Sequence, residues 1–245
     1  MVGTPDEPHG SPDLEQGVQA SEVRRDVLLI GLTCAAGVVD AVSFLGLGQI
    51  FTANMTGNVV FLALALGERS FLSALRSGDA FVVFSLAALI AGQVLLRPRP
   101  AGTWPRRVTL LLWAQVACMV AFAVAWTSVG GVPSGGVLYI LIALSSFGMG
   151  LQNAAARHLA VPGLTTTVVT RALTGFMVDL PALGISGSEQ RRAAATVASL
   201  FTGAAVGASF MAYARVFAPY VTVFTLVVVS VLAYVSFDRP KRAQA

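Results

Sequence analysis

Long apolar runs constrain the fold of this chain more than any other feature. Six runs are long enough to cross a bilayer, at about residues 27–47, 79–96, 108–128, 136–156, 193–214 and 218–236. A hydrocarbon core about 30 Å thick requires about 20 apolar residues in helical form, because lipid offers no partner to an unpaired backbone group. Only 11% of the residues are charged, against about 25% in soluble domains. The sequence therefore predicts an all-α polytopic membrane protein.

Two shorter stretches, at about 50–66 and 165–183, are ambiguous. The first begins with a polar segment, and the second contains Arg171, Asp179 and Pro181. If both crossed fully, the four-arginine loop between the second and third long runs would lie on the opposite side from the amino terminus. If both are re-entrant segments or half-helices, that loop and both termini share one side, and only Arg69, Arg76 and Arg215 are left on the other. Basic residues favour the cytoplasmic side, so we expect the second arrangement, with both termini cytoplasmic.

The expected organisation has four parts. Residues 1–22 are polar and rich in proline and acidic residues, so we expect a disordered tail. Residues 23–130 form a first membrane half and residues 131–237 a second, followed by a basic cytoplasmic tail at 238–245.

Polar residues gather at the end of the first run and in the segment after it. Asp40 lies in Gly37-Val-Val-Asp-Ala, and Phe51-Thr-Ala-Asn-Met-Thr-Gly-Asn follows; its polar members are Thr52, Asn54, Thr56 and Asn58. A polar group in hydrocarbon costs several kcal/mol unless it is paired, so such groups are candidate site residues. Asp40 could couple transport to an ion or contact a substrate. Alternatively, it could cap the Thr52 region or hold two helices together.

A weaker copy of this pattern recurs in the second half. Gly150-Leu-Gln-Asn-Ala lies 113 residues after the first motif and is followed by a threonine-rich segment; its candidate site residues are Gln152, Asn153, Thr166, Thr170 and Arg171. Arg171 needs a carboxylate partner if it lies at depth, and otherwise extends to the lipid headgroups. Three spans and one polar insertion in each half would make the halves an inverted repeat, a plan that recurs among transporters.

Other function classes find little support. There is no HExxH, P-loop or GxSxG motif, so we do not expect an enzyme, and the two histidines and two separated cysteines do not predict a metal site or any other cofactor. Basic residues in short clusters between apolar runs fit cytoplasmic loops rather than nucleic-acid binding. Gly203 and Gly207 form a small-residue face typical of helix packing, either within one chain or in a homo-oligomer.

The first motif, GVVDAVSFLGLGQIFTANMTGNVVFLALALG, resembles that of the YoaK-like family of bacterial inner-membrane proteins. The second, GLQNAAARH followed by TTTVVT, is also similar to the family, and the resemblance covers about residues 27–237. It implies six spans and an inner-membrane location, and it brings no established substrate or activity. Arg171 departs from the family, which often has glycine there, so a close backbone approach is not expected at this position.

From these observations we expect an inner-membrane permease for a small molecule or an ion, with a polar site near the midplane between the two repeats. The alternative is a non-transporting structural or partner-binding membrane protein, in which the polar residues only hold helices together.

Overall fold

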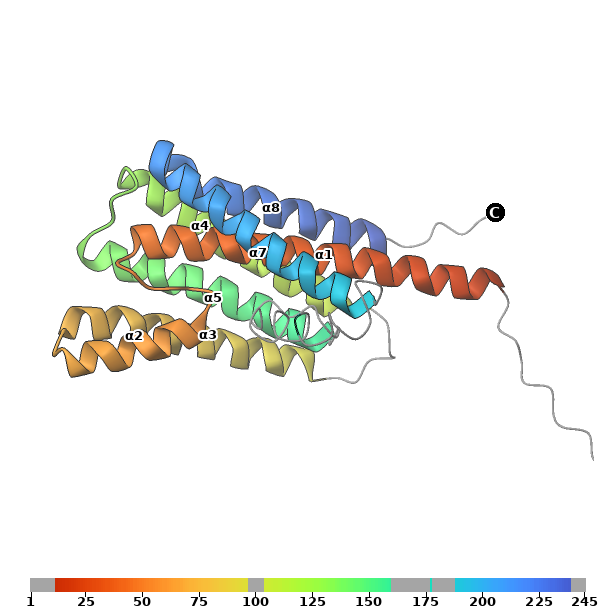
Figure 1. Ribbon diagram of the computed structural model, residues 1–245, viewed down its shortest axis with the longest axis horizontal. Helices are drawn as coiled ribbons and strands as arrows, with labels where there is room; N and C mark the ends of the chain where they lie inside the picture. Colours follow the sequence, from red (N-terminus) through yellow and green to blue (C-terminus); the bar gives the residue numbers. More distant parts are fainter. Residues whose placement is uncertain (1–11, 97–103, 160–176, 178–187, 239–245) are drawn as a thin grey trace, which may run out of the picture.

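The computed structural model describes residues 12–96, 104–159, 177 and 188–238 (Figure 1). In this part of the chain the regular structure is helical throughout: α1 (Pro12–Gly46), α2 (Met55–Gly67), α3 (Phe71–Leu95), α4 (Arg106–Ser128), α5 (Gly135–Leu159), α7 (Ser188–Tyr213), the 3₁₀ turn η1 (Arg215–Phe217), α8 (Ala218–Ala233) and the π-helical turn η2 (Tyr234–Asp238). Among the described residues six helical stretches are long and apolar enough to span a bilayer, and α2 is shorter. The six-span prediction is confirmed.

Two helices begin earlier than the hydropathy pattern predicts. α1 begins at Pro12, inside the segment expected to be disordered, and proline fits the first helical position because that residue needs no backbone donor. α3 begins at Phe71 rather than near residue 79, so Arg76 lies within the helix instead of before it, and Asp79 lies two turns inside it instead of at its start. Polar residues lower mean hydropathy without preventing helix formation, which is why the run appeared shorter than the helix.

The six long helices alternate in direction. Figure 1 shows α1, α4 and α7 running toward the turn between α2 and α3, and α3, α5 and α8 running away from it. We call the end with this turn the hairpin end and the opposite end the basic end. Seven of the described arginines lie toward the basic end: Arg24, Arg25, Arg106, Arg107, Arg157, Arg191 and Arg192. Three lie toward the hairpin end: Arg69, Arg76 and Arg215.

α2 does not cross the bundle. In Figure 1 the connection after α1 turns back from the hairpin end into the bundle, and α2 then returns to that same end. The reversal begins at Gly48 and Gln49, with φ of 89° and 62°, values that glycine adopts readily and other residues seldom do. Thirteen residues of helix measure about 20 Å, which is less than the hydrocarbon core. Residues 47–67 therefore form a re-entrant segment.

The long helices pack in pairs that cross the midpoint of the sequence. α1 packs on α7 and α8, α5 packs on α3 and α4, and α4 packs on α8. Gly203 and Gly207 of α7 lie directly against the backbone of α1 at Cys34 and Val38. The small-residue face is therefore used for packing within the chain.

Polar contacts fasten both ends. At the basic end Arg192 Nε of α7 lies 2.7 Å from Asp26 Oδ2 of α1. At the hairpin end Trp126 donates to the carbonyl of Arg215 at 2.9 Å, and the Arg215 guanidinium donates to the Gly131 carbonyl at 2.7 Å. The first contact joins α1 to α7, and the other two join η1 to α4 and to the loop that follows it.

Candidate functional site

Asp40 holds the re-entrant backbone in place. Its Oδ1 accepts hydrogen bonds from the backbone amides of Thr52 at 3.2 Å, Ala53 at 2.8 Å and Asn54 at 3.4 Å. These amides precede the first turn of α2 and have no partner within that helix, so a carboxylate oxygen replaces the missing carbonyls. Asp40 lies six residues before the end of α1, about 9 Å inside it at 1.5 Å per residue. These hydrogen bonds are the ones expected if Asp40 caps the Thr52 region, one of the two roles considered from the sequence.

Two asparagines complete the turn. Asn58 is fully buried; its Oδ1 accepts from the Phe51 amide at 2.9 Å, and its Nδ2 donates to the Phe51 carbonyl. Asn54 is the N-cap of α2, and its Oδ1 accepts from the Gly57 amide at 3.5 Å. Thr56, by contrast, is exposed. The amino end of α2 is therefore satisfied by the chain's own side chains rather than left open to an anion.

Thr52 connects the re-entrant segment to the second half of the chain. Its hydroxyl lies 2.7 Å from that of Ser145, close to the middle of α5, and both side chains are buried. Sequence reasoning missed Ser145 because two adjacent serines in an apolar span, Ser145 and Ser146, match no site motif. The bond places the non-helical backbone deep within the bundle, where only protein can satisfy it.

Gln152 belongs to a separate polar group nearer the basic end. Its Nε2 donates to the Leu32 carbonyl of α1 at 3.0 Å, and its Oε1 accepts from Gln115 of α4 at 2.5 Å. All three residues lie in the core. Gln115 was not predicted, although a glutamine inside an apolar span was an available signal. The pair joins α1, α4 and α5 by hydrogen bonds that do not involve Asp40.

Asn153 donates from Nδ2 to the Met149 carbonyl at 3.0 Å, one turn earlier in α5. Thr166, Thr170 and Arg171 lie outside the described residues. The structure thus brings Asp40, Thr52, Asn54 and Asn58 together in one cluster and places Gln152 in another.

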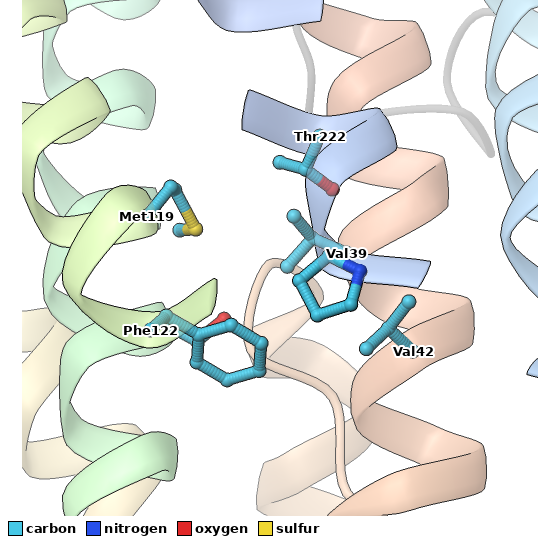
Figure 2. Close-up of a pocket in the computed structure, with 7 residues that line it drawn as sticks. Val39, Val42, Met119, Phe122 and Thr222 are labelled. Atoms are coloured by element: carbon cyan, nitrogen blue, oxygen red, sulfur yellow. The ribbon is translucent and has the colours of Figure 1, made fainter. Parts of the chain in front are cut away.

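A small cavity lies beside the Thr52–Ser145 bond (Figure 2). Its volume is about 10 Å³, and the residues around it are Val39, Val42, Met119, Phe122, Ser145, Pro219 and Thr222. Figure 2 shows Met119 and Phe122 of α4 facing Val39, Val42 and Thr222 across the space. This is about the room that one water molecule needs. Four helices meet here, two from each half of the chain, and none of the described site residues predicted from the sequence lines the cavity.

The chain belongs to the family described as Protein of unknown function (DUF1275), whose model matches residues 28–233. It is 36% identical over 157 residues to the UPF0700 transmembrane protein YoaK of Bacillus subtilis (strain 168), an alignment that covers 64% of this chain and 67% of the relative. No solved structure matches the chain.

Proposed function

We propose that this member of a family of unknown function is a permease of the bacterial inner membrane that moves a small molecule or an ion. The observation that carries the proposal is the re-entrant segment. Non-helical backbone at membrane depth is tolerated where it is buried in protein or lines a water-filled cavity, and broken helices at the contact between two halves are a recurrent transporter plan. The Thr52–Ser145 bond and the adjacent cavity lie at this contact.

Matched packing supports an inverted repeat. In Figure 1 α1 runs opposite to α5, α3 opposite to α7, and α4 opposite to α8. Contacts also correspond: α1 on α7 matches α5 on α3, and α1 on α8 matches α5 on α4. The repeat offset of 113 residues pairs Gly37 with Gly150. This correspondence can be examined atom by atom.

The two glycines have equivalent neighbours. A Cβ on Gly37 would collide with the Leu200 carbonyl and lie 2.8 Å from the Ala204 nitrogen. A Cβ on Gly150 would lie 2.5 Å from the Phe84 carbonyl and 3.2 Å from the Ala88 nitrogen. The neighbours are four residues apart in both cases, and the two sets are offset by the same 116 residues. This agreement favours two related halves over a chance resemblance.

The sidedness of the protein follows from its charges. Seven of the ten described arginines lie at the basic end, so we place this end and both termini in the cytoplasm. The hairpin end then faces outward. The role is binding and translocation rather than catalysis.

A substrate-independent experiment tests the proposal. Thr222→Cys, in a background with Cys34 and Cys118 replaced, places one thiol beside the cavity in Figure 2. We expect a membrane-impermeant thiol reagent to modify it from either face of sealed vesicles, because alternating access exposes the site to each side in turn. Ser230→Cys is the matched control: Ser230 is also buried on α8 but does not line this cavity.

The alternative, a non-transporting structural protein, is favoured by one observation: among the described residues, the side chains of Asp40 and Asn58 form hydrogen bonds only with partners in the first half of the chain. It predicts that Thr222→Cys stays unmodified from both faces under all conditions. Modification from the hairpin end alone would also contradict the permease, since it would reveal a blind cavity.

A further inference from the structure

A second, larger cavity lies at the hairpin end, away from the cluster around Asp40. Its volume is about 300 Å³, within the range of small-molecule sites. Residues from the end of α1, the connection between α1 and α2 (the re-entrant turn, residues 47–54), α2 and the start of α3 line it. Its polar lining residues are Gln49, Glu68, Ser73 and Ser77.

One wall is aromatic. Phe44 and Phe61 line the cavity, and both stack on Phe51 of the re-entrant turn, with ring centroids 5.3 Å and 5.7 Å apart. Such a wall accepts the apolar body of a ligand, and ring faces also attract an ammonium group. The backbone of Phe51 is held by its hydrogen bonds with Asn58.

One charged side chain, Glu68, lines the cavity, and another, Arg76, lies behind its wall. Glu68 lines the cavity and is exposed. The Arg76 guanidinium lies against Gly48, another lining residue: a Cβ on Gly48 would be 2.5 Å from Arg76 Nη1 and 3.0 Å from its Cζ. Arg76 Nε is buried and has no hydrogen-bond partner in the described part of the chain. Neither residue forms an ion pair with another described group.

A guanidinium whose Nε has no partner among the described residues lies behind the cavity, and a carboxylate lies at its edge, so the two complement a ligand that carries both charges. Guanidinium forms strong hydrogen bonds with a carboxylate or phosphate, and glutamate with an ammonium group. We propose that this cavity binds a small zwitterion, an ammonium joined to an acidic group on an apolar body, as the outward-facing site of the permease. The inference names a substrate class and rests on the proposed function. Free amino acids and phosphatidylethanolamine headgroups share this chemistry.

Thermal unfolding of the detergent-purified chain tests the site. The probes are glycine, leucine, phenylalanine and dihexanoyl-phosphatidylethanolamine, compared with phenethylamine, phenylpropanoate and dihexanoyl-phosphatidylglycerol, which each lack one of the two charges. We expect a saturable rise in Tm with phenylalanine or leucine and a weaker one, or none, with the singly charged compounds. A response to the ethanolamine lipid alone would keep the zwitterion site and assign it to a headgroup.

Variants locate the binding. Arg76→Gln and Glu68→Gln should each weaken the apparent affinity at least about tenfold, the effect of removing one charged hydrogen bond. Glu68 is exposed, so its variant will fold even if the Arg76 variant does not. Arg69→Gln, one residue outside the cavity lining, is the matched control and should bind as the unmodified chain does.

Three results would overturn the site: no saturable shift with any zwitterion, equal binding of the singly charged compounds, or equal weakening by Arg69→Gln. None of them affects the labelling of Thr222→Cys. The failure of this site and the failure of the permease are therefore separate observations.

Discussion

Removing the Asp40 carboxylate should release the re-entrant backbone. In Asp40→Ala the amides of Thr52 and Ala53 lose their acceptor, and these residues are only 0% and 5% exposed. A buried donor left unpaired costs about 1–3 kcal/mol, so the two together cost about 2–6 kcal/mol. The third amide belongs to exposed Asn54 and can turn to water.

The measurement is thermal unfolding in detergent. Taking about 3 kcal/mol and about 2–4 °C per kcal/mol for a chain of this size, Asp40→Ala should lower Tm by about 6–12 °C. Asp40→Asn keeps an oxygen acceptor of the same shape and loses only the charge, which makes hydrogen bonds about twice as strong. We therefore expect Asp40→Asn to lower Tm by less than half as much as Asp40→Ala does.

Asp79→Ala is the control. Asp79 is a partly buried carboxylate of α3 whose Oδ2 has no hydrogen-bond partner among the described residues, so its removal leaves no donor unpaired. We expect a change within about 2 °C. Equal losses for the two alanine variants would refute the capping role of Asp40. Equal losses for Asp40→Asn and Asp40→Ala would show that charge, not the acceptor, stabilises the segment.

Further predictions concern the packing and the link between the halves. Gly37→Ala and Gly150→Ala should each lower the free energy of unfolding by about 1–3 kcal/mol, because the added methyl group overpacks a helix contact. Gly92→Ala is the control and should be neutral or slightly stabilising, because a Cβ there would have nothing within 4 Å. Urea unfolding in mixed micelles measures the three variants. Thr52→Val should lower the free energy of unfolding by about 1–3 kcal/mol, because the buried Ser145 hydroxyl loses its partner. Adding Ser145→Ala should recover part of that loss. A double-mutant cycle in which the two effects simply add would contradict the hydrogen bond.

The sequence predicted the spans and the re-entrant segment because one physical constraint governs both. Backbone in lipid must satisfy itself, so hydropathy alone locates the six helices. The 50–66 stretch stood out because it is short and begins with polar residues, and charge balance favoured a return to the same side. The early start of α3 was missed, since Arg76 and Asp79 lower hydropathy while remaining helical.

The contacts of the site were less accessible to sequence reasoning. That Asp40 could cap the Thr52 region was one of two interpretations, and residue types alone could not choose between them. Its partners are backbone amides, which every residue except proline possesses, so no residue pattern marks them. Ser145 and Arg76 acquire their importance only from what lies opposite them: a threonine hydroxyl in one case and a glycine beside a cavity in the other.

The packing also determines which parts of a permease could move. Rocking the sequence halves as rigid bodies would separate α1 from α7 and α3 from α5, the two contacts where glycine allows backbones to touch. Such interfaces are close-packed and have no intermediate arrangement of low energy. The bodies that can move are therefore the pairs α1–α7 and α3–α5, each built from both halves. Between them lie the Thr52–Ser145 bond, the bond from Gln152 to the Leu32 carbonyl, and the small cavity. Each bond is worth about 1 kcal/mol net, so we expect this boundary to be the one that opens in the proposed permease.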